Sequence, residues 1–367
     1  MSSHRFIQLD VFTREPFAGN PLAVFPEAEG LTDEQMMKIA REMNLSETVF
    51  VLRPVREQSA ESNQQSAKSE PKAASDPTST DVSEPSAQTA GTENRNAGEV
   101  AQRNLQANSD SPKVLRRLRI FTPAREIPFA GHPVVGTWNA LAHEGVVPLP
   151  ENNNGWTRIY QEVGIGVLPV DIEFEAGVPV QVVMTQGNPK MGNVLDDRGE
   201  QEDLTRALGL AIEDLDETLP IQVISTGLPF LAVPIRSLAD LRRCRVNAAL
   251  LAEIYDGTGA TGCSVFSRET IEIGAARVHT RMFAPGDNIP EDPATGSAAG
   301  ALGAYLVHHG AQSIEPIDGQ FRFVIEQGDF MHRPSRINIE VTGKPGAVTE
   351  VRVGGPSVIV AHGEVFV

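Results

Sequence analysis

The sequence predicts an α+β fold made of two similar lobes, each a mostly antiparallel sheet wrapped around a central helix, with the functional site in the cleft between the lobes. Three observations lead to this prediction. Many strand-like segments do not alternate regularly with helices, which disfavours both a helical bundle and a doubly wound parallel sheet. Two glycine-bounded segments, 131–145 and 296–310, resemble each other. A long polar stretch separates two strand-like segments, so the globular part is shorter than the chain.

The secondary-structure pattern contains several strands and a few helices. Thr32 and Gln35 form a capping-box pattern, and an apolar stripe follows them, so a helix is predicted over 32–44. Two further helices are expected over 204–215 and 238–255. The expected strands are 6–12, 48–52, 118–121, 160–174, 180–184, 278–284, 321–327, 336–341 and 358–367.

The internal repeat suggests a duplicated unit. Segment 131–145 reads GHPVVGTWNALAHEG and segment 296–310 reads GSAAGALGAYLVHHG. Each predicts a helix that begins at a glycine and is stopped by a C-terminal glycine. Phe-Thr-Pro precedes the first segment and Phe-Ala-Pro the second. We therefore expect a first lobe over 1–190 and a second lobe over 191–367.

The polar stretch over 54–113 is predicted to be a disordered insert. Its residues are mainly Ser, Ala, Glu, Gln, Asn, Thr and Pro, and no aromatic residue lies between Phe50 and Phe121. Such a composition cannot bury enough apolar surface to offset the entropy lost on ordering. The strand-like flanks suggest a hairpin with an expanded turn, which is tolerable because closure entropy grows only logarithmically with loop length. An inert insertion is favoured over a docking segment.

Composition narrows the classes of partner. The chain has 367 residues and a formal net charge of −17, which disfavours nucleic acid and anionic membranes as partners. Two cysteines, Cys244 and Cys263, are too few for a disulfide scaffold. The N-terminal residues lack a signal-peptide core, and no apolar run is long enough to span a bilayer, so a cytoplasmic protein is predicted. A homodimer is left open.

Motifs for common cofactors and metals are incomplete. Gly164-Ile165-Gly166 lacks the third glycine of a dinucleotide fingerprint, and His143-Glu144 lacks a second histidine at zincin spacing. No cofactor and no metal are therefore expected, and the predicted partner is a small-molecule carboxylate.

The two predicted helix starts are the candidate site. A helix N-terminus presents unpaired N–H groups and the positive end of the helix dipole. Two such ends facing each other would bind a carboxylate. Candidate residues are Ala130, Gly131 and His132 at the first start, and Thr295, Gly296 and Ser297 at the second, with Asp292 shortly before it. The alternative is that His132, Asp292 and Ser297 only cap helices.

Several longer motifs are similar to those of the phenazine biosynthesis-like (PhzF-like) family, within the diaminopimelate-epimerase fold superfamily. They occur in the same order along nearly the whole chain outside the insert. The matching segments are 10–13, 17–24, 44–50, 119–123, 128–133, 225–230, 291–298, 327–328 and 333–335. The family fold also implies that the last strand can return to the first lobe.

The resemblance implies a cofactor-independent isomerase that moves a proton on a small carbon acid bearing a carboxylate. Glu47 would be the general acid/base, with His132, Asp292 and Ser297 as its partners. Gly131, Pro133, Thr295 and Gly296 would bind the substrate. Cysteine-dependent racemase relatives carry Cys where this chain has Ala130 and Thr295, so a two-thiol mechanism is disfavoured.

Pro290 and His332 depart from the family pattern and leave the substrate open. Two other functions remain as alternatives. One is a hydrolase that uses Ser297, His132 and Asp292, and the other is a non-catalytic binding protein with the same fold.

Overall fold

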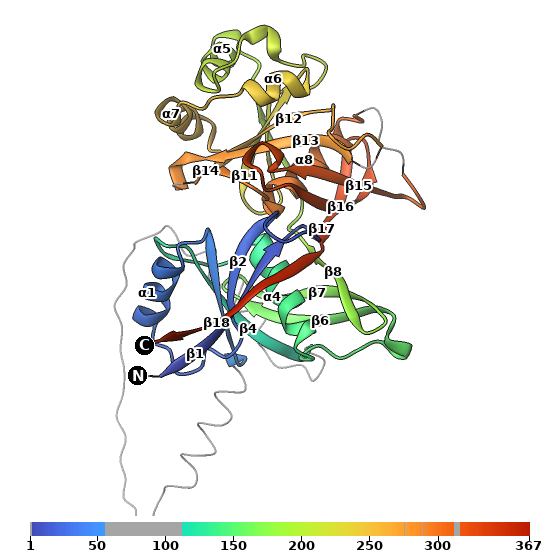
Figure 1. Cartoon of the computed structure of the whole chain (residues 1–367). Helices are drawn as coiled ribbons and strands as arrows, with labels where there is room; N and C mark the ends of the chain where they lie inside the picture. The colour runs from blue at the N-terminus through green and yellow to red at the C-terminus, as the bar shows by residue number, and fades with distance from the viewer. Residues whose placement is uncertain (1, 56–111, 275, 288, 312–315) are drawn as a thin grey trace, which may run out of the picture.

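The computed structural model describes residues 2–55, 112–274, 276–287, 289–311 and 316–367. All but the ends of the predicted insert over 54–113 lie outside the described residues. The described chain forms two lobes joined by strands, as predicted (Figure 1).

Strands dominate both lobes. In chain order they are β1 (Ser3–Val11), β2 (Asn20–Phe25), β3 (Glu47–Leu52), β4 (Val114–Phe121), β5 (Glu126–Ile127), β6 (Gly155–Val163), β7 (Gly166–Glu175), β8 (Val178–Thr185), β9 (Lys190–Val194), β10 (Gln222–Ser225), β11 (Pro229–Ile235), β12 (Gly262–Ser267), β13 (Ala276–Ala284), β14 (Ile289–Asp292), β15 (Gln320–Gln327), β16 (Ser335–Lys344), β17 (Ala347–Gly355) and β18 (Ser357–Phe366). The α-helices are α1 (Asp33–Met43), α4 (Gly131–His143), α5 (Arg198–Ala207), α6 (Leu238–Arg243), α7 (Ala248–Thr258) and α8 (Gly296–His308).

The sheet order repeats between the lobes. Outward from the junction, the first lobe runs β8–β7–β6–β4–β3–β2–β1–β18. The second lobe runs β17–β16–β15–β13–β12–β11–β10–β9. In both lobes the successive pairings are antiparallel, antiparallel, parallel, antiparallel, parallel, antiparallel and antiparallel. The repeat inferred from the two glycine-bounded segments therefore extends to the topology of the whole lobe.

Two strand pairings tie the lobes and the chain ends together. Strand β8 pairs antiparallel with β17, with Val182 opposite Gly355, and this pair forms the junction. Strand β18 crosses back to the first lobe and pairs antiparallel with β1, with Ser3 opposite Phe366. The two termini consequently lie side by side in the first lobe (Figure 1). The exact boundary near residue 190 stays a prediction.

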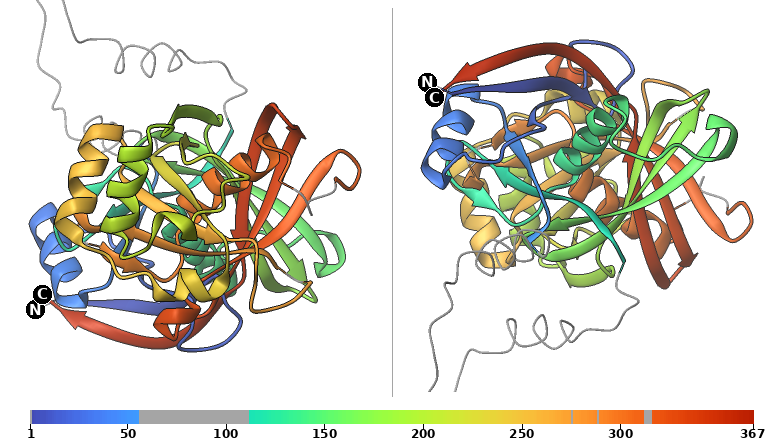
Figure 2. Two further views of the ribbon diagram at one scale, coloured as in Figure 1. Left: turned by 90° about the horizontal axis from the view of Figure 1, so that it is seen from above. Right: turned by 90° about the horizontal axis from the view of Figure 1, so that it is seen from below.

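Helices α4 and α8 are the central helices of the two lobes, and the sheets curve around them (Figure 2). Nearly every residue of both helices is buried. Trp138 of α4 is fully buried and its indole Nε1 donates a hydrogen bond of 2.6 Å to Gln161. Tyr305 of α8 donates a hydrogen bond of 2.6 Å to the carbonyl of Pro220. Each central helix thus anchors a large aromatic residue inside its lobe through a hydrogen bond.

The capping box of α1 and the strands flanking the insert are confirmed. Thr32 accepts from the backbone of Gln35, whose side chain accepts in return from the backbone of Thr32. Strands β3 and β4 pair antiparallel, with Leu52 opposite Arg117.

Two helix predictions are wrong in extent. The helix expected over 204–215 is α5, which begins at Arg198 after the N-cap Asp197 and ends before Gly209 in the left-handed region. The helix expected over 238–255 is two helices, because the chain leaves the helical conformation at Cys244 and restarts after Asn247, which caps α7.

Candidate active site

Parallel strands β2 and β3 bring Asn20 and Glu47 to one edge of the first lobe, because Leu22 pairs with Glu47 and both strands begin there. The turn before Asn20 needs a glycine. Gly19 has a φ of +61°, and a Cβ at this position would lie 2.3 Å from the carbonyl oxygen of Val11. Helix α4 begins at the same edge, and β14 and α8 of the second lobe face it.

The starts of α4 and α8 are in contact, as the repeat predicted. A Cβ on Gly131 would lie 3.3 Å from the backbone nitrogen of Ser297. Neither N-cap residue, Ala130 or Thr295, places a side-chain hydrogen bond on its helix start. The alternative that Asp292 or Ser297 serves as the N-cap of α8 is therefore wrong. The first N–H groups of a helix have no partner within the helix, and two helix starts meet here, which is an arrangement that favours an anion.

Glu47 and His132 form a buried pair within this site. Oε2 of Glu47 lies 3.2 Å from Nε2 of His132, and the side chains are 11% and 6% exposed. The two atoms are not aligned for a good hydrogen bond, and neither has another partner among the described residues. Burial, reinforced by the charge of Asp292, raises the pKa of Glu47 to about 8. Burial lowers the pKa of His132 to about 3, so its ring is neutral near pH 7.

Asp292 lies on the other side of the site and is held by several donors. Thr295 donates a short hydrogen bond to Oδ2, and Asn20 donates to Oδ1 at 3.0 Å. Gln327 supports the same turn by donating to the Asp292 carbonyl at 2.7 Å and to the Thr295 hydroxyl at 3.1 Å. Burial raises the pKa of Asp292 to about 6, although the bonds from Thr295 and Asn20 oppose this rise.

Asn20 connects the two lobes at the site, and the sequence reasoning did not assign it a role. Its side chain is fully buried. Nδ2 lies 3.0 Å from Asp292, 2.8 Å from the carbonyl of Ala294 and 3.3 Å from Nδ1 of His132, while Oδ1 accepts from Ser46 at 3.2 Å. Asn20 lies within the family-like segment 17–24, but nothing in that segment indicates which residues its side chain contacts.

The remaining candidates also lie at the two helix starts. Pro133 is buried in the first turn of α4, and Ser297 is half-buried in the first turn of α8. The Gly296 carbonyl accepts a hydrogen bond of 2.8 Å from Gln186. A Cβ on Gly296 would point at the ring of Phe12, 3.2 Å away, so a side chain at this position would enter the protein interior.

The geometry does not form a Ser–His–Asp relay. Among the described residues, the ring nitrogens of His132 contact Glu47 and Asn20, and no hydrogen bond joins His132 to Ser297 or directly to Asp292. A hydrolase of this type needs a base bonded to the nucleophile and oriented by a carboxylate. This arrangement disfavours the hydrolase alternative.

The two cysteines are remote from the helix starts. Both belong to the apolar cluster beneath α5, α6 and α7, on the outer face of the second lobe. Burial raises the pKa of Cys244 to about 11 and of Cys263 to about 12, so both remain thiols at neutral pH. They contribute nothing to the site between the lobes.

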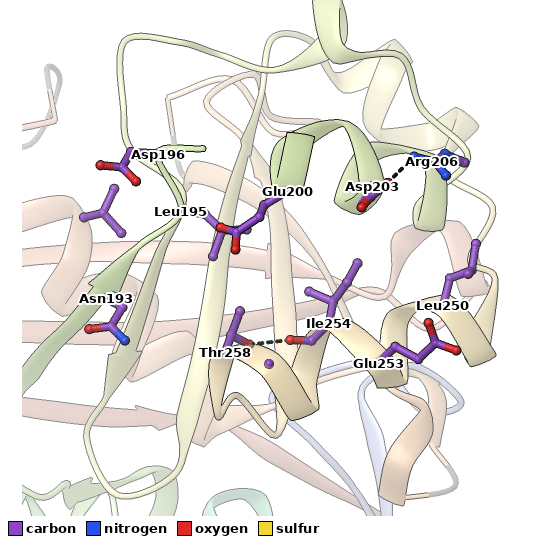
Figure 3. Close-up of a pocket in the computed structure, with 12 residues that line it drawn as sticks. Asn193, Leu195, Asp196, Glu200, Asp203, Arg206, Leu250, Glu253, Ile254 and Thr258 are labelled. Carbon is purple, nitrogen blue, oxygen red and sulfur yellow. Dashed lines mark hydrogen bonds and ion pairs between the residues drawn. The ribbon is translucent and has the colours of Figure 1, made fainter. Parts of the chain in front are cut away.

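A separate surface pocket of about 810 Å³ lies between α5, α7 and the segment that follows β9 (Figure 3). Its lining includes Asp196, Glu200 and Glu253 beside apolar Leu250 and Ile254. None of the predicted site residues lines this pocket, so we do not assign the chemistry to it.

Two lobes of repeated topology, each wrapped around a buried central helix, define the epimerase-like fold class. A family model described as phenazine biosynthesis-like protein (PhzC-PhzF) matches residues 9–63 and 105–363. The chain therefore belongs to the phenazine biosynthesis-like family of isomerases.

Relatives of similar length support this placement. An uncharacterized isomerase from Clostridium acetobutylicum is 33% identical over 361 residues, covering 98% of this chain and 97% of the relative. A trans-2,3-dihydro-3-hydroxyanthranilate isomerase from Pseudomonas chlororaphis is 30% identical over 364 residues, covering 99% of each chain.

Solved structures support the fold. A crystal structure of a PhzF-family phenazine biosynthesis protein from Bacillus anthracis has a TM-score of 0.74 at 24% identity, with full coverage of both chains. A hydroxyproline epimerase from Agrobacterium vitis has a TM-score of 0.55 at 13% identity, covering 99% of this chain and 92% of that one. The diaminopimelate-epimerase-like architecture expected from the sequence is confirmed.

Within the described part of the chain, no helix is long and apolar enough to cross a membrane. The same residues contain no group of three or more His, Cys, Asp or Glu side chains arranged to hold a metal ion.

Proposed function

We propose that the protein moves a proton between two carbons of a small, carboxylate-bearing carbon acid, with Glu47 as the general acid/base. The observation that carries this proposal is the pairing of the buried Glu47 with His132 directly beside the two converging helix starts. The N–H groups of Gly131 and Ser297 would bind the substrate carboxylate, and this would place a neighbouring carbon next to Glu47.

The electrostatics of Glu47 suit proton transfer to and from carbon. A general base works best when its pKa lies near the working pH. Burial and the charge of Asp292 raise the pKa of Glu47 to about 8, far above that of an exposed glutamate. The carboxylate form would remove a proton from one carbon, and the resulting carboxylic acid would return it to another. The protein therefore needs a single group that cycles between its two forms.

The other side chains would position and stabilise the reacting system. His132, neutral because of its burial, would orient Glu47 or donate a hydrogen bond to charge that develops on the substrate. The Ser297 hydroxyl, at the open start of α8, would contact a substrate oxygen. Asp292 is held by Thr295 and Asn20 and would bind a polar substituent on the substrate.

The chemical class of substrate follows from the site and from the relatives. Trans-2,3-dihydro-3-hydroxyanthranilate, which the relative from Pseudomonas chlororaphis is named for, carries a carboxylate on an unsaturated ring. We propose a substrate of the same class, a small unsaturated or α-substituted carboxylate. Pro290 and His332, two separate positions that depart from the family pattern, would adjust the shape of the substrate site.

The proposal is tested by screening small carboxylates for thermal stabilisation and then incubating each hit with the protein in D₂O. Solvent deuterium should enter the product of the wild-type protein and should enter far more slowly with Glu47→Gln. A non-catalytic binding protein would be stabilised by the same ligands without exchange in either form, and that outcome would overturn the proposal.

A further inference from the structure

Asn20 has a chemically unambiguous orientation. Its amide nitrogen faces the carbonyl oxygen of Ala294 at 2.8 Å and the carboxylate of Asp292 at 3.0 Å, and both of these groups accept hydrogen bonds. Turning the amide over would place Oδ1 against two acceptors in a fully buried position. The Ser46 hydroxyl donates to Oδ1 on the other side. The nitrogen of Asn20 must therefore be the atom that faces His132.

This orientation decides where the neutral ring of His132 carries its proton. Nδ1 of His132 lies 3.3 Å from the NH₂ group of Asn20. A proton on Nδ1 would point at a donor and would have no acceptor. A neutral imidazole has one proton, so we place it on Nε2, which lies 3.2 Å from the carboxyl group of Glu47.

We infer that Asn20 is a positioning residue that selects the Nε2–H tautomer of His132, so that the ring presents an N–H donor and not a basic nitrogen on the side that faces Glu47 and the substrate. Asn20 also donates to Asp292, so one amide contacts a titratable residue from each lobe. This inference rests on the proposed function, because it assigns the role of His132 within that site.

The direct test reads the tautomer in the wild-type protein. Long-range ¹H–¹⁵N correlation spectra of the ¹⁵N-labelled protein near pH 7 report which ring nitrogen of each histidine is protonated. The chain has eight histidines, and the His132 signals are assigned by their loss in His132→Gln. We expect a protonated Nε2 and an unprotonated Nδ1. A proton on Nδ1, or a doubly protonated ring, would overturn the inference.

Variants at Asn20 test whether this residue causes the tautomer preference of His132. Asn20→Asp replaces the N–H donor with an acceptor, so the proton of His132 should move to Nδ1 or the ring should become cationic. Asn20→Leu keeps the volume and removes the donor, so both tautomers should appear. We expect kcat to fall at least about 10-fold in both variants with a smaller change in KM, because a wrong tautomer at a catalytic histidine can cost up to about 10⁴-fold.

Gln222 offers a matched control. It is also a buried amide in contact with a histidine, because its Oε1 lies 2.7 Å from Nε2 of His309, just beyond the far end of α8. Gln222→Leu should change the spectrum of His309 and leave His132 and kcat unaltered. Loss of the Nε2–H signal of His132 in this control as well would show that the tautomer depends on general packing and not on Asn20.

The outcome is separable from the proposed function. Full activity of Glu47→Gln together with an Nε2–H tautomer of His132 would remove the proposed function and keep the tautomer assignment. An inactive Glu47→Gln together with an Nδ1–H tautomer of His132 would keep the proposed function and remove the tautomer assignment.

Discussion

Replacing Glu47 with glutamine should make the protein more stable while abolishing most of its activity, and the gain in stability should grow with pH. The pKa of Glu47 is raised by burial from 4.5 to about 8. Between pH 4.5 and about pH 8, Glu47 stays protonated in the folded protein but loses its proton in the unfolded chain. The free energy of unfolding therefore falls as pH rises through this window, and the full penalty is present above pH 8.

The magnitude follows from the size of the shift. One pKa unit corresponds to about 1.36 kcal/mol. The rise of the Glu47 pKa from 4.5 to about 8 therefore lowers the free energy of unfolding by at most about 5 kcal/mol above pH 8. Glutamine is uncharged at every pH and escapes this penalty. Between pH 6 and pH 8 the stability advantage of Glu47→Gln over the wild type should increase by about 2–3 kcal/mol.

The assay is urea unfolding at pH 6, 7, 8 and 9, followed by circular dichroism, with wild type and variant compared at each pH. The matched control is Glu42→Gln on the exposed face of α1, which should track the wild type throughout. In parallel, turnover of any substrate identified by screening should fall by about 10²–10⁴-fold in Glu47→Gln. A constant stability difference across pH would show that Glu47 is ordinarily solvated and would remove the physical basis for its role as the base.

Three other predictions address the site and the insert. Because Asp292 contributes to the raised pKa of Glu47, Asp292→Asn should move the rising limb of the kcat/KM–pH profile from about 8 to lower pH, whereas an unshifted limb would mean that the two carboxylates do not interact. Gly131→Ala places a methyl group 3.3 Å from the Ser297 nitrogen, so titration calorimetry should show at least about 10-fold weaker carboxylate binding with little change in Tm, while the open helical position Gly257→Ala should bind normally. Replacing 54–113 with a short glycine-containing turn between β3 and β4 should leave Tm and carboxylate affinity unchanged, and a large loss of either would show that the segment packs on the body.

The structure decides which of the two helix-start glycines should be substituted to test carboxylate binding. The sequence repeat makes Gly131 and Gly296 equivalent, and from the sequence alone a bulky side chain at either position is expected to block the proposed carboxylate site. The Cα of Gly296, however, faces Phe12, so Gly296→Val would strain the core and report on stability. We therefore expect substitution of Gly131, and not of Gly296, to report on carboxylate binding.

The sequence predicted helix starts better than helix lengths. Gly131, Gly296 and the Thr32 capping box were correct because each start has a local chemical signal. Helix α5 was placed late because its first turns are polar and its apolar residues lie only near its end. Its true start carries a signal of its own, since Asp197 accepts a hydrogen bond from the backbone of Glu200.

The site was predicted unevenly for a physical reason. Glu47, His132, Asp292 and the glycines lie in motifs that resemble a known family, and the structure brings them together. Asn20 was missed because its four partners come from segments up to 274 positions away in the chain. No local pattern reveals that a buried amide will meet a histidine, a carboxylate and a carbonyl at once.

The pairing of β18 with β1 has a consequence for how the protein is made. Strand β1 can pair with β2 early, but it meets its second neighbour, β18, only after the second lobe has been synthesised, since Ser3 lies opposite Phe366. Until then, one edge of the first lobe remains unpaired, and such edges recruit other chains. Pairing between such distant segments is also slow to form. The lobe that supplies Glu47 and His132 therefore begins to form before the second lobe, but it completes its sheet only after the second lobe has been synthesised.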